Sequence, residues 1–320
     1  MKLVVVAPES FQDLALLRRL ESRDLAIVVS ESTEVLKRAI ADADAIALAP
    51  RHGRLLRELW PRASKLRWVH TLGAGVDTLL FDEVAHSGVI VTNSRGLFAD
   101  ALAEFVIAAM LWFAKDLRRL ADNQRQHRWE PYTVQRLEGL TVGIIGYGGI
   151  GRAVARRSHA LGMHVIATRR RSELASGDAI VSRMYEAREI DALVAESSYL
   201  VLSTPLTAST YRLMNANRLS LMRSDSVLIN VSRGEVVDER VLVGLLRDHR
   251  IRGAALDVFE SEPLPQYDPL WAQDNVLISP HSADHTGDSH ARSMAFFLEQ
   301  LDRFQRGEPL ESVVDKQERY

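Results

Sequence analysis

Residues 141–151 read TVGIIGYGGIG and contain the motif G-x-G-x-x-G. The motif follows an apolar, strand-like run and opens a helical pattern over residues 149–161, which is the setting that a dinucleotide site requires. Gly146 allows a tight turn, Gly148 lets the backbone approach a pyrophosphate, and Gly151 lets the helix pack closely on the strand. The amino end of the helix offers N–H groups to the phosphates. The stretch therefore predicts a dinucleotide-binding βαβ unit.

The next strand-like run, residues 164–168, bears on the choice of dinucleotide. In many such folds this strand ends in an acidic residue that binds the ribose hydroxyls. Here Arg169 stands at that position and Arg170 follows it. A guanidinium pairs with a ribose 2′-phosphate, which a carboxylate would repel. The sequence therefore favours NADP(H) over NAD(H), although a solvated arginine-rich loop would accept either cofactor.

Short β-rich runs alternate with helical patterns on both sides of the glycine motif. Strands that are apolar in the middle and separated by helices indicate parallel sheets covered on both faces. We therefore predict an α/β protein with two doubly wound parallel-sheet domains, one flavodoxin-like and one of Rossmann type. The expected strands are residues 3–6, 26–29, 45–49, 67–70 and 89–92 in the first series, and 141–145, 164–168, 199–203, 226–231, 253–258 and 276–279 in the second.

A single long helix is expected from residue 98 to about residue 124. Because residues 101–114 are apolar on nearly all sides, this helix should be buried between domains or in a subunit interface. The polar segment 126–139, which contains Trp129, is typical of a linker, and residues 286–306 predict an amphipathic helix.

Composition excludes several classes of protein. The chain has 320 residues, and its 40 Lys and Arg against 42 Asp and Glu give a net charge of −2, which argues against a protein built to hold nucleic acid or an anionic membrane. There is no cysteine, so disulfides and thiolate metal sites are excluded. The longest apolar run, residues 105–114, is far shorter than the roughly 20 residues that span a bilayer. We therefore expect a cytoplasmic protein.

Three later segments place polar residues at the ends of predicted strands, where open α/β sheets bind ligands. Residues 228–234 read LINVSRG, residues 255–265 read ALDVFESEPLP, and residues 278–281 read ISPH. With the glycine motif, they resemble the D-isomer-specific 2-hydroxyacid dehydrogenase family. The run GAGVD at residues 73–77 and the arginine-rich cofactor loop look like its glyoxylate/hydroxypyruvate reductase branch. The resemblance covers nearly the whole chain and includes three shorter motifs, which are LGAGVD at residues 72–77, AE at 103–104 and TPLT at 204–207.

The resemblance implies an oxidoreductase that moves a hydride between a nicotinamide and a small 2-keto acid such as glyoxylate or hydroxypyruvate. His281 would protonate the carbonyl oxygen, because an imidazolium gives up a proton near neutral pH. Glu262 would stabilise that imidazolium. Arg233 would bind the substrate carboxylate and polarise the carbonyl. The backbone N–H groups of Ala74 and Gly75 would complete the substrate cradle.

The resemblance also gives a set of cofactor-contacting residues and a domain division. Asp257 would lie near the nicotinamide carboxamide. The expected cofactor contacts are Gly146, Gly148, Gly149, Ile150, Gly151, Thr168, Arg169, Arg170, Thr204, Pro205, Val231, Ser232, Asp257 and His281. The expected domains are a substrate domain at residues 1–98 plus 285–320 and a cofactor domain at residues 99–284.

Taken singly, each catalytic candidate has an ordinary structural interpretation. An Arg after a strand usually forms a salt bridge, a Glu before Pro usually lies in a turn, and a His after Pro is usually structural. Glu260 lies two residues from Glu262 and competes with it. We choose Glu262 because the family motif puts the acid directly before the proline. The joint pattern of Arg233, Glu262 and His281 favours catalysis.

A metal site is a rival interpretation of residues 281–290, which include three His and two Asp. The pattern lacks the Glu that a metalloprotease helix carries beside its first His. The Asp residues are more simply first-turn acids favoured by the helix dipole. We therefore expect no metal.

Asp284 replaces a small residue of the family and brings a negative charge near an anion-binding cleft, so the preferred substrate size stays open.

Two further questions concern assembly and function. The family pairs its subunits through the long helix, so we expect a homodimer through residues 98–124, and Trp129 either packs locally or reaches a partner's active site. A nucleotide-sensing, corepressor-like protein on the same fold is the alternative function. A formate or phosphite dehydrogenase is a narrower one, and it fits less well because formate enzymes have Gln where Glu262 stands. A sensor has no need of a proton donor beside the nicotinamide, so the residues favour the reductase.

Overall fold

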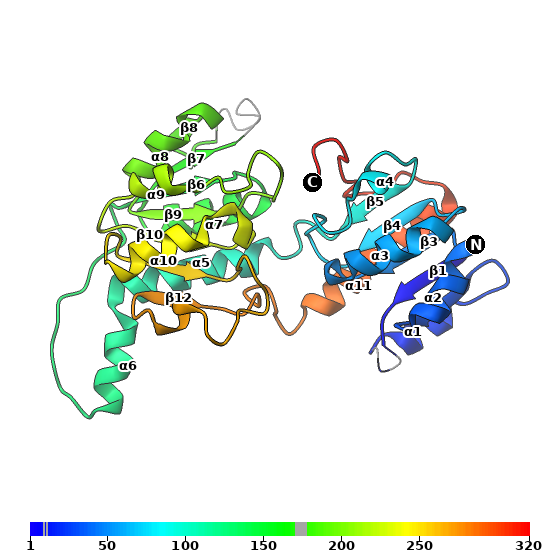
Figure 1. Cartoon of the computed structure of the whole chain (residues 1–320), viewed down its shortest axis with the longest axis horizontal. Helices are drawn as coiled ribbons and strands as arrows, with labels where there is room; N and C mark the ends of the chain where they lie inside the picture. Colours follow the sequence, from blue (N-terminus) through cyan, green and yellow to red (C-terminus); the bar gives the residue numbers. More distant parts are fainter. Residues whose placement is uncertain (9, 11, 170–177) are drawn as a thin grey trace. The chain divides into compact units, whose positions relative to one another are not determined.

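The computed structural model describes residues 1–8, 10, 12–169 and 178–320, which form two compact units (Figure 1). The chain leaves the first unit after Leu97 and returns to it at Gly287, so the second unit is an insertion in the first. Unit 1 consists of Met1–Leu97 and Gly287–Tyr320, and unit 2 consists of Phe98–Thr286.

Unit 1 is built on a five-stranded parallel sheet with the order β2-β1-β3-β4-β5, which is the flavodoxin-like order that the sequence predicts. Buried aliphatic side chains fill the central strands β1 and β3, as expected for strands that are covered by helices on both faces. The strands are β1 (Lys2–Val6), β2 (Ala26–Ser30), β3 (Ala45–Leu48), β4 (Trp68–Thr71) and β5 (Ile90–Asn93). The α-helices are α1 (Leu14–Leu20), α2 (Thr33–Ala39), α3 (Gly53–Leu59), α4 (Asp82–Ala85) and α11 (Ser289–Arg306).

The C-terminal part of the chain completes unit 1. The apolar side of α11 joins the core of the sheet, where the Phe297 ring stacks on Trp68 with the ring centroids 5.7 Å apart. Beyond the helix, Val313 forms an antiparallel bridge with Thr92 on the edge strand β5. The helix predicted over residues 286–306 begins at Ser289 instead, and Asp288 is its N-cap residue. The first turn of the helix carries no acidic residue, so the interpretation of Asp284 and Asp288 as first-turn acids is wrong.

Unit 2 contains a seven-stranded parallel sheet with the order β12-β11-β10-β9-β6-β7-β8. Read from β8, this is the Rossmann order 3-2-1-4-5-6 with one more strand, as predicted. β8 was not predicted, because a strand of three residues, of which only Tyr185 is buried, carries little hydrophobic pattern. The strands are β6 (Thr141–Ile145), β7 (His164–Thr168), β8 (Arg183–Tyr185), β9 (Tyr199–Leu202), β10 (Val227–Asn230), β11 (Gly253–Leu256) and β12 (Val276–Ile278).

The helices of unit 2 cover both faces of this sheet (Figure 1). α7 ends at Ala160 and is followed by Gly162 with φ of 75°, the left-handed conformation that glycine adopts most easily. The α-helices are α5 (Ala99–Lys115), α6 (Leu117–Arg125), α7 (Gly149–Ala160), α8 (Ile190–Glu196), α9 (Ala216–Ser220) and α10 (Glu239–Arg247).

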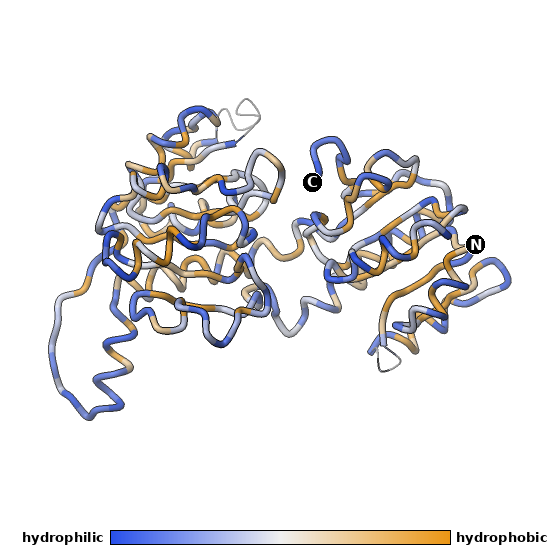
Figure 2. The backbone as a smooth tube through the Cα atoms, in the orientation of Figure 1, coloured by the Kyte–Doolittle hydropathy of each residue, from blue (hydrophilic) through white to orange (hydrophobic). Residues whose placement is uncertain are grey.

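The single helix expected over residues 98–124 is wrong, because the structure has two helices there. Asp116 separates α5 from α6 in a left-handed conformation with φ of 49°, and its carboxylate accepts a hydrogen bond from the Arg119 N–H. The two helices differ in character along the hydropathy-coloured chain, with α5 apolar and α6 strongly hydrophilic (Figure 2). A helical pattern in the sequence does not reveal this break, since one Asp is tolerated in a helix interior.

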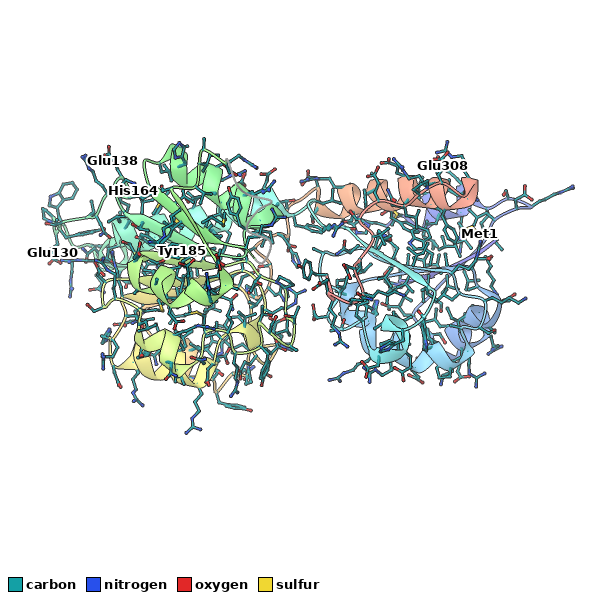
Figure 3. All side chains as sticks on the ribbon, turned by 90° about the horizontal axis from the view of Figure 1, so that it is seen from above. Met1, Glu130, Glu138, His164, Tyr185 and Glu308 are labelled. Carbon is teal, nitrogen blue, oxygen red and sulfur yellow. The ribbon has the colours of Figure 1, made fainter. Side chains whose placement is uncertain are left out.

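α6 and the segment 126–139 extend from the body of unit 2, and the side-chain view shows Glu130 far out on this arm (Figure 3). The arm returns to the body where Gln135 N–H donates to the Ala114 carbonyl at 2.8 Å and Lys115 donates to the Gln135 carbonyl at 2.8 Å.

Within the described residues, no helix is both long and apolar enough to cross a membrane.

Candidate active site

The glycine motif forms the turn between β6 and α7, and each outer glycine is required by close packing. Gly146 has φ of 103°, and a Cβ there would lie 2.8 Å from the backbone of Ser203 and Thr204. A Cβ on Gly151 would lie 2.4 Å from the Gly146 carbonyl oxygen. Any larger residue at either position would therefore push the turn out of place.

Gly148 and Gly149 lack such a packing reason. A Cβ on either would meet no atom within 4 Å, and both residues are exposed. Their lack of a side chain instead leaves space in front of the amino end of α7, whose N-cap Gly148 offers no side-chain cap. An open approach to the amino end of a helix is what a pyrophosphate needs. The turn therefore fits a dinucleotide.

Arg169 follows β7 directly, beside the glycine turn. Thr168, the last residue of β7, accepts hydrogen bonds at its carbonyl from the N–H groups of Gly146 and Tyr147 at 3.2 and 3.0 Å. The Nη1 atom of Arg169 is buried and has no hydrogen-bond partner among the residues that the structure describes. A buried donor without a partner is uncommon and suits an anionic ligand. Arg170 lies outside the described residues.

The other expected cofactor contacts follow neighbouring strands of the same sheet. Thr204 and Pro205 follow β9, Val231 and Ser232 follow β10, and Asp257 follows β11. Because all of these strands are parallel, their carboxyl ends meet at one edge, and the order reverses between β6 and β9. This reversal is where open α/β sheets bind their ligands.

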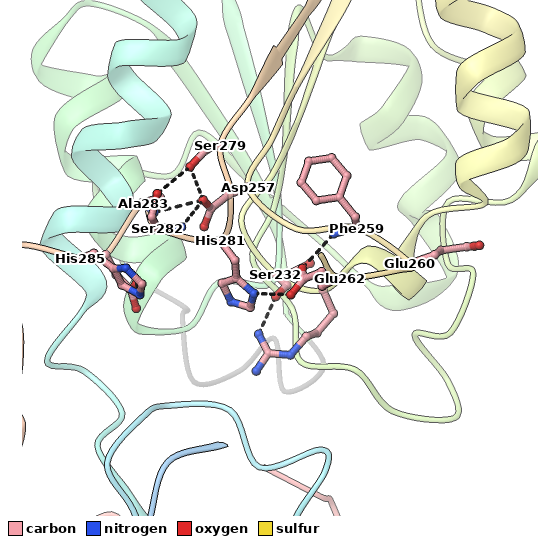
Figure 4. Close-up of polar contacts among 12 residues, drawn as sticks. Ser232, Asp257, Phe259, Glu260, Glu262, Ser279, His281, Ser282, Ala283 and His285 are labelled. Carbon is pink, nitrogen blue, oxygen red and sulfur yellow. Dashed lines mark hydrogen bonds and ion pairs between the residues drawn. The ribbon is translucent and has the colours of Figure 1, made fainter. Parts of the chain in front are cut away.

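His281 and Glu262 form the central contact of the site. His281 Nδ1 lies 2.8 Å from Glu262 Oε2, and the other carboxylate oxygen, Oε1, accepts a hydrogen bond from the Phe259 N–H at 3.0 Å (Figure 4). The Glu262 carboxylate is thereby held by backbone on one side and faces the imidazole on the other. This contact fixes the ring tautomer with a proton on Nδ1, which leaves Nε2 to exchange protons with a ligand.

The electrostatics of this pair favour the protonated imidazole. The hydrogen bond and the negative charge of Glu262 raise the pKa of His281, although burial and the nearby Arg233 oppose the rise. Burial acts to raise the pKa of Glu262, but the bond to His281, its charge and the Phe259 N–H together lower that pKa. The pair therefore favours imidazolium beside carboxylate, the state in which His281 can donate a proton.

Glu260, the competing acid, is engaged elsewhere. Its carboxylate lies 3.6 Å from the Arg212 guanidinium, and its backbone N–H donates to Glu239 at 3.1 Å. The structure thus brings Glu262, and not Glu260, to the imidazole.

Arg233 lies near the pair, and the electrostatic effect of its charge reaches both His281 and Glu262. Its Nη1 donates to the Ser232 carbonyl at 2.7 Å. The next residue, Gly234, packs so tightly that a Cβ would fall 1.9 Å from the carbonyl carbon of Phe259. The segment that carries Arg233 and the segment that carries Glu262 are therefore in direct contact.

Asp257 is buried and organises the loop after His281. Its Oδ1 accepts hydrogen bonds from Ser279 Oγ at 2.5 Å and from the N–H groups of Ser282 and Ala283 at 2.9 and 3.0 Å (Figure 4). Burial raises the pKa of Asp257, and these hydrogen bonds partly offset the rise. The family resemblance predicted that Asp257 belongs to the site, but its contacts with Ser279 and the loop were not predicted.

Ala74 and Gly75 belong to unit 1, where they follow β4. The carbonyl of Ala74 accepts from Asn93 Nδ2 at 2.7 Å, and the carbonyl of Gly73 accepts from the Ser94 N–H at 3.0 Å. The N–H groups of Ala74 and Gly75 make no hydrogen bond to any described residue. The loop is thus anchored through its carbonyls and offers its amides to a ligand.

The His and Asp residues considered for a metal lie in separate contacts. His285 lies 3.7 Å from Asp284, while His290 contacts Asp13 of unit 1 at 2.5 Å. Among the described residues, no group of three or more His, Asp or Glu is arranged to hold a metal ion. Asp284 is half-buried, and the structure gives it no partner that explains its departure from the family.

Comparison with known proteins gives the family of the chain. Residues 107–283 match the family described as D-isomer specific 2-hydroxyacid dehydrogenase, NAD binding domain. The chain is 33% identical over 294 residues to a glyoxylate reductase of Thermofilum pendens, an alignment that covers 89% of this chain and 85% of the relative.

Solved structures of similar proteins support the same family. A D-isomer specific 2-hydroxyacid dehydrogenase family protein of Aeromonas salmonicida superimposes with a TM-score of 0.85 at 28% identity, covering 98% of this chain and 99% of that one. A D-isomer specific 2-hydroxyacid dehydrogenase of Xanthobacter autotrophicus, in complex with NADPH and MES, gives 0.82 at 30% identity and covers 99% of each chain. The chain therefore belongs to the D-isomer specific 2-hydroxyacid dehydrogenase family and is an oxidoreductase that transfers a hydride between a nicotinamide cofactor and a 2-hydroxy or 2-keto acid.

Proposed function

We propose that the enzyme reduces a small 2-keto acid of the glyoxylate or hydroxypyruvate type, with Arg233, Glu262 and His281 as its catalytic residues. The observation that carries the proposal is the 2.8 Å contact between His281 and Glu262 beside Arg233, at the carboxyl ends of β10, β11 and β12. The similarity to a glyoxylate reductase of Thermofilum pendens supports the substrate class.

Each residue has a distinct part in the reaction. A bound NAD(P)H would supply the hydride to the carbonyl carbon. Arg233 would hold the substrate carboxylate and draw electron density toward the carbonyl oxygen. His281 would transfer the proton on Nε2 to that oxygen as negative charge develops there, and Glu262 would stabilise the imidazolium until the transfer. The free N–H groups of Ala74 and Gly75 support a role for unit 1 as the substrate domain.

The test is the initial rate of NADPH and NADH oxidation with glyoxylate, hydroxypyruvate, pyruvate and branched 2-keto acids. We expect turnover that is fastest with glyoxylate or hydroxypyruvate. Oxidation that is faster with a branched 2-keto acid would overturn the substrate assignment. A protein that binds the dinucleotide but oxidises it with none of these acids would favour the sensor alternative.

We further propose that the enzyme prefers NADP(H) and accepts NAD(H) less well. The buried, unpartnered Nη1 of Arg169 supports this preference, as does NADPH in the related Xanthobacter autotrophicus enzyme. Changing Arg169 to Asp should lower the ratio of kcat/KM for NADPH to that for NADH by at least about tenfold, because a charge-assisted bond becomes a repulsion.

The matched control for this substitution is Arg188→Asp, which makes the same charge change at a surface residue that pairs with Glu186 at 2.9 Å. The control should leave the ratio unchanged. If Arg169→Asp leaves it unchanged as well, Arg169 does not select the cofactor.

We also propose a homodimer that pairs through residues 98–124, which carry α5 and most of α6. An apolar groove between α5 and α7, lined by Ile107, Leu111 and Leu161, supports this interface. Trp129 is 97% exposed within one chain, which contradicts local packing and suits a residue covered by a partner. Sedimentation analysis should give twice the chain mass, and a monomer at micromolar concentration would refute the proposal.

The cytoplasmic location stays a prediction from the sequence.

A further inference from the structure

Asn230 is the last residue of β10 and has 1% of its surface exposed. Its Oδ1 accepts hydrogen bonds from the Ser232 N–H at 3.0 Å and from Ser232 Oγ at 2.7 Å. Its Nδ2 donates to the Arg233 carbonyl at 3.0 Å. Because a backbone N–H only donates and a carbonyl only accepts, these partners fix the orientation of the amide. The amide oxygen of Asn230 is thus bonded to Ser232, and the amide nitrogen is bonded to the backbone of Arg233.

The backbone around Arg233 is also held from its other side. The Arg233 carbonyl accepts a second hydrogen bond from the Val236 N–H at 3.3 Å. Gly234 packs against the backbone of Phe259, whose N–H in turn binds Glu262. Contact with Phe259 therefore limits movement of the backbone at Gly234. The Asn230 amide holds the backbone of Arg233 from within the same turn, residues 230–233.

We propose that Asn230 is a positioning residue, whose side-chain amide sets the backbone of Ser232 and Arg233 so that the guanidinium meets the substrate carboxylate in a two-bond geometry. This inference rests on the proposed role of Arg233 as the substrate-binding cation. Asn230 touches neither substrate nor cofactor in this account, and its whole effect on the reaction passes through Arg233.

The chemistry of the three bonds makes Asn the residue required. Asp has the same shape and still accepts both bonds from Ser232, but it has no donor for the Arg233 carbonyl and sets a carboxylate oxygen against it. Gln is longer by one methylene in a fully buried place. Asn230→Asp therefore breaks the one contact that reaches Arg233 and preserves the two contacts that do not.

The experiment is a double-mutant cycle on kcat/KM for the best 2-keto acid, with Asn230→Asp in the native and in the Arg233→Ala background. We expect Asn230→Asp to lower kcat/KM on the order of tenfold in the native background, mainly through KM for the 2-keto acid, with KM for NADPH nearly unchanged. In the Arg233→Ala background the same change should have no effect, because the guanidinium that it positions is gone.

A matched control is Asn215→Asp, where the side chain caps α9 by accepting from the Arg218 N–H at 3.1 Å, a bond that Asp makes equally well. The control should keep native kcat/KM. If Asn230→Asp fails to fold, Asn230→Ser takes its place in the same cycle, with the same expected dependence on Arg233.

The possible results separate this inference from the proposed function. An equal loss in both backgrounds, or no loss in the native background, would overturn the positioning role of Asn230. Native kcat/KM in Arg233→Ala itself would instead overturn the role of Arg233 in the proposed function, whatever Asn230 does.

Discussion

Replacing His281 with Ala is expected to lower kcat for 2-keto acid reduction by at least about 10²-fold, the usual contribution of a general acid. In free energy this is about 2.7 kcal/mol of transition-state stabilisation. The reason is that the carbonyl oxygen would then take its proton from water as negative charge develops. The measurement is the single-turnover rate at saturating cofactor and substrate, so that product release does not conceal the chemical step.

A second variant and a control make this result specific. His281 has φ of 52°, a left-handed conformation that Asn tolerates well, so His281→Asn removes the acid with little change to the backbone. His164→Ala removes an exposed imidazole at the start of β7 and should leave kcat unchanged. Near-normal turnover in both His281 variants would remove this residue from the role of proton donor.

The pH dependence of the reaction tests the partner of His281 separately. Reduction needs the protonated imidazole, so kcat should fall as pH rises through the raised pKa of His281. Glu262→Gln removes the charge and weakens the hydrogen bond that raise this pKa. The fall in kcat should therefore move to lower pH in the variant. An alkaline limb at the same pH in both proteins would show that Glu262 does not tune His281.

The second large effect concerns Arg233. Changing Arg233 to Lys is expected to lower kcat/KM for the 2-keto acid by about 10²-fold or more, with little change in KM for NADPH. Lys keeps the positive charge but replaces a planar fork by a single ammonium, which cannot bind a carboxylate through two parallel bonds. Steady-state kinetics of the native and variant enzymes, with the 2-keto acid and NADPH varied in turn, measure both effects.

Arg223→Lys is the control for this substitution. Arg223 forms a two-bond pair with Asp225, at 2.8 Å for each bond, on the surface of the same unit. Loss of this two-bond pair in Arg223→Lys should leave kcat/KM unchanged, because an exposed ion pair contributes little to the stability of the protein. If Arg233→Lys retains native kcat/KM, the guanidinium makes no direct contact with the substrate.

Much of the fold was predictable because most of the strands consist of buried apolar residues. β6 and β7 begin and end at the predicted residues, since apolar runs such as TVGII end abruptly at a glycine or a charge. The break at Asp116 and the edge strand β8 were missed for the opposite reason. The first depends on a local left-handed conformation, and the second on pairing with β7, and neither leaves a hydrophobic pattern.

The candidate site was predictable as a set of residues but not as a network. Motif positions named Arg233, Glu262 and His281, and the choice between Glu260 and Glu262 rested on the proline that follows. Asn230 and Ser279 were missed as supporting residues, because their importance lies in hydrogen bonds to the backbone of Arg233 and to Asp257. The signal for Asn230 was present, since a polar residue ends a strand that is otherwise apolar.

A crystal structure of the enzyme with NADPH and an unreactive 2-keto acid analogue, such as oxamate, tests the central claim most directly. We predict that the analogue's carboxylate receives two bonds from the Arg233 guanidinium and that its carbonyl oxygen lies within hydrogen-bonding distance of His281 Nε2, with the nicotinamide ring beside it. An analogue bound elsewhere, or oriented so that neither side chain reaches it, would contradict the account.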